Sequence, residues 1–266
     1  MKHLDDIDDP QTSPPARAAL VTGAARNVGR AIALRLAADG LAVAVNSRSD
    51  RDAAQAVVDE IISAGGRAVV ALADVCDQSA VEQVVADARR QLGPITVVVC
   101  NAAVRSSARF TEIEPDEWDA TIRTALYGAY HCIRACVADM IDASFGRIVA
   151  ISGDGPHQGM PGHAHVGAAK LGLEGLIRGI STELGGDGVT ANVVSPGIVA
   201  TERRSRSELD RARLEEQIAN SLKDNPLGRA IEVDEIADVV AYLASPAAAF
   251  LSGQTVHVNG GGYHGY

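Results

Sequence analysis

The amino-acid sequence predicts an α/β fold, with a doubly wound parallel sheet of about seven strands and helices on both faces. Short apolar segments alternate with amphipathic, helix-like segments along almost the whole chain, which is the pattern of repeated βαβ units. Residues 95–100 are almost purely apolar, as expected for a strand that is covered on both faces. The chain has 266 residues and shows no internal repeat or linker, so we expect a single domain.

The expected elements alternate in order along the chain. We expect strands at residues 18–22, 41–45, 68–73, 95–100, 147–152, 189–194 and 255–258. Between them we expect a helix that ends at Ala38, and helices at residues 52–64, 79–92, 115–144, 165–184 and 233–243. Right-handed crossovers then place the carboxyl ends of the strands, and the ligand, at one edge of the sheet.

Two segments do not fit this alternation. Residues 1–17 contain three prolines and four aspartates without an apolar period, which predicts a flexible N-terminal leader before a domain at residues 18–266. Residues 202–223 are charged, have helical periodicity and lie between Pro196-Gly197 and Pro226. This segment is the natural substrate lid, although an ordinary surface helix has the same pattern.

Composition excludes several classes of protein. The chain carries 24 Lys and Arg against 34 Asp and Glu, a formal charge of −10, which argues against a nucleic-acid or anionic-membrane surface. The most apolar stretch, residues 236–251, is interrupted by Asp238 and Pro246 and is too short to span a membrane. The acidic N-terminus does not resemble a secretory signal, and the four cysteines show no CxxC spacing. We therefore expect a cytoplasmic protein.

A glycine-bearing turn follows the first strand and opens the first helix. It reads TGAARNVGR over residues 22–30. Gly23 permits a tight turn, and Gly29 allows the helix to approach the strand closely. The N-terminus of the helix then presents N–H groups and a positive dipole end to a pyrophosphate. In this position the motif predicts a Rossmann-type dinucleotide site.

With these motifs, residues 18–262 resemble the short-chain dehydrogenase/reductase family. Asn27 stands where the family has a third glycine, and Asn tolerates left-handed backbone conformations better than most residues. Asp74-Val75 resembles the family's adenine contact, and Asn101-Ala102-Ala103 resembles its Asn-Asn-Ala-Gly motif, with Cys100 and Ala103 as departures. The segment from Ser195 through Pro196-Gly197 to Thr201 resembles the part that holds the nicotinamide. The resemblance implies a set of cofactor contacts: Gly23, Arg26, Asn27, Val28, Gly29, Arg48, Asp74, Val75, Asn101, Ala102, Lys170, Pro196, Gly197 and Thr201.

The residues after the second strand favour NADP over NAD. An NAD site usually has a carboxylate there to accept the ribose hydroxyls. Here the strand is followed by Asn46-Ser47-Arg48-Ser49, with no acid before Asp50. Arg26 in the glycine turn and Arg48 are both placed to bind a 2′-phosphate. The alternative is that both are solvated surface arginines.

The family's reactive centre is only partly present. The resemblance implies a Tyr that protonates the substrate, a Lys four residues later, a Ser thirteen residues before the Tyr, and an Asn on the preceding long helix. Lys170 fits the Lys position, but the other three positions hold Val166, Gly153 and Ala125. None of these three side chains can donate a proton.

Several nearby polar residues are candidates to replace the missing acid. His165 and Ser152 repeat the Tyr–Ser spacing displaced by one residue, but one helical residue is a rotation of about 100°. His163 lies in the loop before the helix, and Asp154 follows Gly153. A histidine is well suited to acid–base work near pH 7. We expect no metal site, because no third ligand follows the His163–His165 pair at a recognisable spacing.

These observations favour an NADP-dependent oxidoreductase acting on a small carbonyl or imine-like substrate, with Lys170 and one of His163, His165 or Asp154 as catalytic residues. An already activated substrate such as an iminium needs no proton on its acceptor atom. Two alternatives remain open: a nucleotide-binding protein without redox turnover, and a non-redox enzyme such as a dehydratase or cyclase. The resemblance also implies a homo-oligomer, a dimer or a tetramer.

Overall fold

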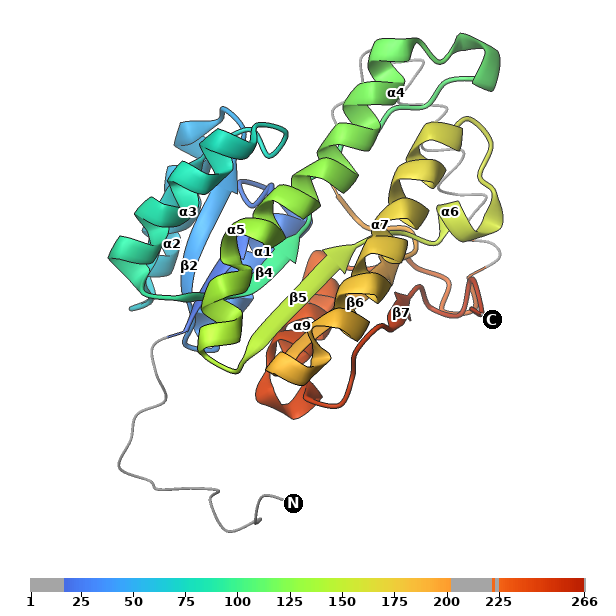
Figure 1. Ribbon diagram of the computed structural model, residues 1–266. Helices are drawn as coiled ribbons and strands as arrows, with labels where there is room; N and C mark the ends of the chain where they lie inside the picture. The colour runs from blue at the N-terminus through green and yellow to red at the C-terminus, as the bar shows by residue number, and fades with distance from the viewer. Residues whose placement is uncertain (1–16, 202–221, 223–224, 266) are drawn as a thin grey trace.

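The protein folds around one parallel sheet, seen in the computed structural model of residues 17–201, 222 and 225–265 (Figure 1). Seven strands pair in the order β3-β2-β1-β4-β5-β6-β7, and every neighbouring pair is parallel. The strands are β1 (Ala18–Val21), β2 (Ala42–Ser47), β3 (Ala68–Leu72), β4 (Ile95–Cys100), β5 (Gly146–Ile151), β6 (Val189–Pro196) and β7 (Thr255–Val258). The prediction of a doubly wound parallel sheet of about seven strands is confirmed.

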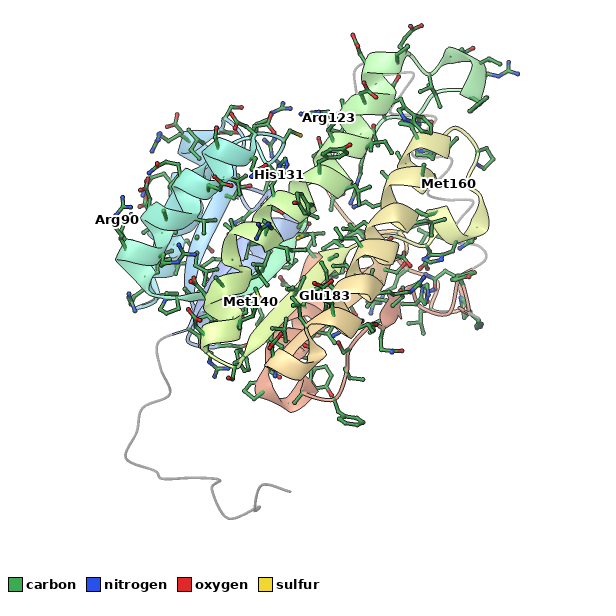
Figure 2. The ribbon with its side chains drawn as sticks, viewed as in Figure 1. Arg90, Arg123, His131, Met140, Met160 and Glu183 are labelled. Atoms are coloured by element: carbon green, nitrogen blue, oxygen red, sulfur yellow. The ribbon has the colours of Figure 1, made fainter. Side chains whose placement is uncertain are left out.

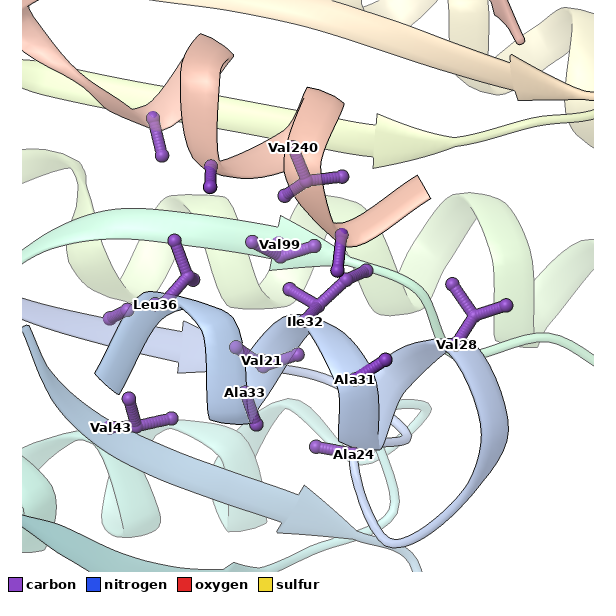
Figure 3. Packing of buried hydrophobic residues seen from close by; sticks show 14 of the residues in the cluster. Val21, Ala24, Val28, Ala31, Ile32, Ala33, Leu36, Val43, Val99 and Val240 are labelled. Carbon is purple, nitrogen blue, oxygen red and sulfur yellow. The ribbon is translucent and has the colours of Figure 1, made fainter. Parts of the chain in front are cut away.

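Helices cover both faces of the sheet. On one face lie α1 (Asn27–Ala38), α2 (Arg51–Ser63) and α9 (Val233–Ala244), which pack on alternate strand residues such as Val43 and Val99. Figure 3 shows Ile32 of α1 and Val240 of α9 in this cluster. On the other face lie α3 (Gln78–Leu92), α5 (Gly128–Asp142) and α7 (Ala164–Glu183). Because both faces are buried, the inner strands are mostly apolar.

The predicted helix at residues 115–144 is present but changes its winding along its length. It consists of α4 (Pro115–Ile122), a π-helical segment (Arg123–Tyr127) and α5. Gly128 opens α5 beside the loop after β3, where an added Cβ would lie only 2.6 Å from a methyl carbon of Val75. A π-helical turn inside a long helix often lies at a functional site. Ala125, at the family's Asn position, is buried in this turn.

Other bounds differ from the expectation in ways that affect the edge of the sheet. β2 continues through Asn46 and Ser47, and β6 continues to Pro196. A short helix, α6 (Gly155–Gln158), and three 3-10 turns at residues 110–112, 185–187 and 246–248 were not predicted. The predicted leader lies outside the described residues except for Arg17, and the predicted lid lies outside them except for Leu222. Among the described helices, none has the length and apolarity that crossing a bilayer requires.

Candidate active site

The glycine turn after β1 has the backbone conformation that its sequence requires. Gly23 has a φ of +61° and Asn27 a φ of +48°, both in the left-handed region. An added Cβ on Gly29 would lie 2.3 Å from the carbonyl oxygen of Gly23, so a larger residue cannot occupy that position without displacing the turn. Asn27 therefore takes the left-handed conformation in which a third glycine would meet no steric penalty.

This turn leads directly into the N-terminus of α1. Arg26 is the N-cap residue, and its side chain makes no capping hydrogen bond. An anion bound at this terminus would complete the helix end, as a pyrophosphate does in dinucleotide-binding proteins. The backbone of the turn and the uncapped α1 terminus therefore fit a dinucleotide.

Thr22 and Asn101 lock the turn to the end of β4. The Thr22 hydroxyl donates to the carbonyl oxygen of Val99 (3.2 Å) and accepts bonds from the amides of Asn101 and Ala102 (both 2.9 Å). In return, Nδ2 of Asn101 donates to the carbonyl oxygens of Thr22 (2.9 Å) and Gly23 (3.2 Å). The side chain of Asn101 thus holds the turn in place, and its backbone lies beside it.

Asn46 makes a second lock that the sequence analysis missed. Its Oδ1 accepts from the amide of Gly23 (3.2 Å), and its Nδ2 donates to the carbonyl oxygens of Ala71 (2.9 Å) and Ala73 (3.1 Å). Its side chain thereby joins the carboxyl ends of β1, β2 and β3. The signal available in the sequence was that Asn46 is the first polar residue after the apolar run of β2.

Two arginines lie near the end of β2, as the sequence placed them. Arg48 and Arg26 are both exposed. Nη2 of Arg26 lies 3.4 Å from Oδ2 of Asp50, while Oδ1 of Asp50 caps α2 by accepting from the amide of Ala53 (3.2 Å). A 2′-phosphate at this position would compete with Asp50 for Arg26.

The loop after β3 carries the predicted adenine contacts. Oδ1 of Asp74 accepts from the amide of Cys76 (2.9 Å), which shapes the turn. Val75 is buried, and its carbonyl oxygen accepts from Nδ1 of His131 on α5 (2.9 Å; Figure 2). The loop is therefore fixed from the α5 side.

Lys170 is buried on α7 beside the end of β5. Its Nζ donates a 2.6 Å hydrogen bond to the carbonyl oxygen of Ile151. Burial lowers the pKa of Lys170 to about 7, and the charge of Arg105 acts in the same direction. Val166 precedes Lys170 by one helical turn on α7, so a valine stands where the family has its tyrosine.

His165 is held by the loop after β4 and by α4. It is fully buried, its Nε2 lies 2.8 Å from the hydroxyl of Ser106 and 3.9 Å from a carboxylate oxygen of Glu117, and its Nδ1 has no hydrogen-bond partner among the described residues. Ser152, its expected partner at the family spacing, donates instead to Glu174 on α7 (2.7 Å). The structure does not bring His165 and Ser152 together.

Asp154 is turned away from Lys170. Its Oδ1 accepts from the Ser195 hydroxyl (2.9 Å) and from Nδ1 of His257 on β7 (2.7 Å). This carboxylate is therefore bound at the β6–β7 side of the sheet. The sequence analysis missed His257, which lies 103 residues further along the chain.

His163 is the predicted histidine that lines a cavity. The cavity measures about 350 Å³ and lies between the loop after β4, the α6 region and the start of α7. Most of its lining is small or apolar: Ala108, Phe110, Gly155, Pro156, Gly159, Met160, Pro161, Gly162, Ala164, Gly167 and Ala168. Met160 is labelled in Figure 2, near the start of α7. Nδ1 of His163 donates to the carbonyl oxygen of Pro161 (2.9 Å), so Nδ1 carries a proton in this contact.

The segment expected to hold the nicotinamide is fixed at the end of β6. Pro196 accepts a bond from the amide of Asp154 (3.0 Å), and the amide of Gly197 donates to Val258 (3.0 Å). An isolated parallel bridge between Val199 and Ile231 anchors the chain just before Thr201. The glycine turn, Lys170 and this segment thus meet at the carboxyl edge of the sheet.

The chain is similar to known proteins along almost its whole length. The family described as Enoyl-(Acyl carrier protein) reductase matches residues 23–264. The 3-oxoacyl-(acyl-carrier-protein) reductase of Staphylococcus epidermidis is 36% identical over 247 residues, which is 93% of this chain and 99% of that protein. The Escherichia coli K12 protein of that name is 36% identical over 245 residues, covering 92% and 96%. A solved structure described as a putative short-chain alcohol dehydrogenase from Sinorhizobium meliloti 1021 matches with a TM-score of 0.86 and 31% identity, covering 94% and 96%.

Proposed function

The chain belongs to the short-chain dehydrogenase/reductase family, and we propose that it is an NADP-dependent oxidoreductase that acts on a small carbonyl or imine-like substrate. The observation that carries this proposal is the rigid glycine turn at the carboxyl edge of the sheet, which we call the cofactor edge. Thr22, Asn46 and Asn101 hold the glycine turn with side-chain bonds, opposite the uncapped start of α1. Such a preformed turn binds an anion without having to order itself first.

The residues of the cofactor site divide into three groups. Residues 23–29 and the first turn of α1 would hold the pyrophosphate. Asp74, Val75 and Ala102 would contact the adenosine half, and Arg26 and Arg48 would bind its 2′-phosphate. Lys170, Pro196, Gly197 and Thr201 would hold the nicotinamide half. When bound, NADPH supplies the hydride.

The reactive centre favours a substrate that needs little proton donation. Val166, Gly153 and Ala125 cannot polarise a carbonyl oxygen, and a positioned general acid contributes about 10²–10⁴-fold to such a reaction. An iminium carries its activating charge already, so its reduction does not depend on that acid. Binding and orienting the two reactants then supply most of the rate enhancement.

For a carbonyl substrate, we propose His163 as the proton donor. Of the three candidates, His165 is fully buried against Ser106, and Asp154 is bound by Ser195 and His257. His163 lines the cavity, and its bond to Pro161 leaves Nε2 to exchange the proton. Substrate would enter from the side of this cavity.

The missing tyrosine also supports a second candidate function, a nucleotide-binding protein without redox turnover. NADPH oxidation across a panel of ketones and cyclic imines separates the two. Turnover with any of them supports the oxidoreductase, whereas tight NADPH binding with no oxidation supports the second function. A His163→Ala variant that loses ketone reduction but keeps imine reduction would support the proposed donor.

We further propose that the protein works in the cytoplasm as a homo-oligomer, a dimer or a tetramer. All four cysteines are free thiols, and three of them are buried. This is the usual state of cysteines in a reducing compartment. Light scattering at several protein concentrations would measure the oligomeric state.

A further inference from the structure

The carboxylate of Asp154 contacts side chains of two strands, β6 and β7. It is buried in the loop after β5, where it accepts from Ser195 of β6 and His257 of β7. Ser195 and His257 are direct neighbours in the β6–β7 ladder, so their side chains leave the same face of the sheet. The carboxylate therefore closes a bridge across the carboxyl ends of three strands.

A second histidine–carboxylate pair lies beside the first. Glu174 of α7 is buried, with one carboxylate oxygen 2.9 Å from Nε2 of His157, outside hydrogen-bond geometry, and the other 3.2 Å from the hydroxyl of Thr255. The rings of His157 and His257 lie 5.2 Å apart, edge to face. The ring of Tyr263, near the C-terminus, is 5.6 Å from that of His157 and 5.0 Å from that of His257. The C-terminal segment thus covers the pair.

Asp154 and the chain around His257 also bond to Ser195–Gly197, the segment that our proposed function assigns to the nicotinamide. Besides its side-chain bond to Ser195, Asp154 donates its own amide to the carbonyl oxygen of Pro196 (3.0 Å). On the other side, the amide of Gly197 donates to Val258, the residue after His257 (3.0 Å). An added Cβ on Gly197 would lie 3.1 Å from Asn259, so the two segments are in close contact.

We propose that Asp154 and His257 are positioning residues that hold Ser195–Gly197 in the conformation that binds the nicotinamide. The inference rests on the proposed cofactor function. A buried carboxylate needs its hydrogen-bond donors, and His257 is one of the two side chains that supply them. Loss of that donor exposes Asp154 to water or turns it away, and either change loosens the end of β6.

The first measurement is amide hydrogen exchange without nucleotide, on the full-length wild type and three variants. In His257→Ala we expect about tenfold faster exchange at the amides of Asp154 and Gly197, and unchanged exchange at α1. His257→Asn places an amide donor near the position of Nδ1 and should restore the protection. His264→Ala, an exposed histidine of the same segment, is the matched control and should exchange like wild type.

The second measurement compares the affinities for NADPH and for 2′,5′-ADP, which lacks the nicotinamide. We expect His257→Ala to weaken NADPH binding about tenfold or more, because a lost hydrogen bond to a charged group has an effect of about this size. Binding of 2′,5′-ADP should be unchanged, because it has no nicotinamide. Equal loss for both nucleotides, or unchanged exchange at Gly197, would overturn the inference. If the wild type binds neither nucleotide, the proposed function fails, and the exchange experiment alone decides whether the bridge holds the segment.

Discussion

Nζ of Lys170 donates a 2.6 Å hydrogen bond to the carbonyl oxygen of Ile151, where β5 ends beside α7. The amine is buried, and one helical turn before it stands Val166, where the family's tyrosine would be. The chain thus has a lysine at the family's lysine position and a valine at its tyrosine position.

Lys170 should make the stability of the protein depend on pH. Its pKa falls to about 7 in the folded state, against about 10.4 in an unfolded chain. The unfolded state therefore binds more protons between these values, and stability rises as the pH is raised from about 7 toward about 10. Lys170→Met removes this slope. Urea denaturation of the wild type and of Lys170→Met from pH 6 to pH 10 should show a difference in the free energy of unfolding that changes steadily across this window. A constant difference would contradict the lowered pKa of Lys170.

Restoring two of the three missing polar groups should increase ketone reduction. An added Cβ on Gly153 would meet the carbonyl oxygen of Pro196 at 3.7 Å, an ordinary contact, so a serine fits there. We expect Val166→Tyr with Gly153→Ser to raise kcat/KM for simple ketones by about 10²-fold or more. Leu171→Tyr, which adds a tyrosine at an exposed position of α7, is the control. No gain over this control would show that the pocket is limited by something other than proton donation.

Arg48 should distinguish the two cofactors. It is exposed at the end of β2, where our proposal places the 2′-phosphate. Arg48→Ala should weaken NADPH binding about tenfold or more and leave NADH binding unchanged, since only the former loses a charge-assisted bond. Isothermal calorimetry with both nucleotides measures this. Arg90→Ala, a change at an exposed arginine in the last turn of α3, is the control, and parallel loss of NADH affinity would contradict the assignment.

Asp50 should oppose NADPH binding through Arg26. The two side chains lie 3.4 Å apart, and both are partly exposed, so the pair is worth only about 0.2–1 kcal/mol. Asp50→Asn removes the competing charge and retains the cap on α2, because its Oδ1 still accepts. We expect NADPH affinity to rise about two- to fivefold at low salt, with a smaller gain at high salt. Weaker binding would instead identify Asp50 as a ribose ligand.

The hydroxyl of Thr22 should stabilise the folded protein. Thr22→Val keeps the shape but leaves the amides of Asn101 and Ala102 without their acceptor, while the carbonyl oxygen of Val99 keeps the bond from the backbone amide of Thr22 (3.0 Å). Unsatisfied buried groups of this kind cost about 1–3 kcal/mol each, so we expect a loss of about 2–4 kcal/mol in the free energy of unfolding. Thr22→Ser retains the hydroxyl and should lose much less. Chemical denaturation of both variants measures the difference.

The sequence predicted the fold because its signals are local. Apolar runs at the strands and the left-handed positions Gly23 and Asn27 are set by neighbouring residues, and the structure has the strands and the glycine turn where the sequence predicts them. The partners of the polar candidates are not local. His257 lies 103 residues after Asp154, and Ser106 lies 59 residues before His165.

Sequence spacing therefore identified polar residues near the site but did not predict their hydrogen-bond partners. Ser152 illustrates this, because it has the expected spacing from His165 but bonds to Glu174 on α7. At Asn46 the sequence indicated only that no carboxylate follows the second strand. The bonds of Asn46 to Ala71 and Ala73 could not be predicted, because they depend on the order in which the strands pair.

We propose that the preformed cofactor edge supports hydride transfer without a tyrosine donor. The most direct test is the rate of NADPH oxidation in a single turnover with a cyclic iminium and with the ketone of the same ring size. In the His163→Ala variant, which lacks the proposed donor, we expect the iminium to be reduced at least about 10²-fold faster, since only the ketone needs a proton on its acceptor atom. Saturating NADPH binding with no oxidation of either compound, or equal rates for both, would contradict the claim.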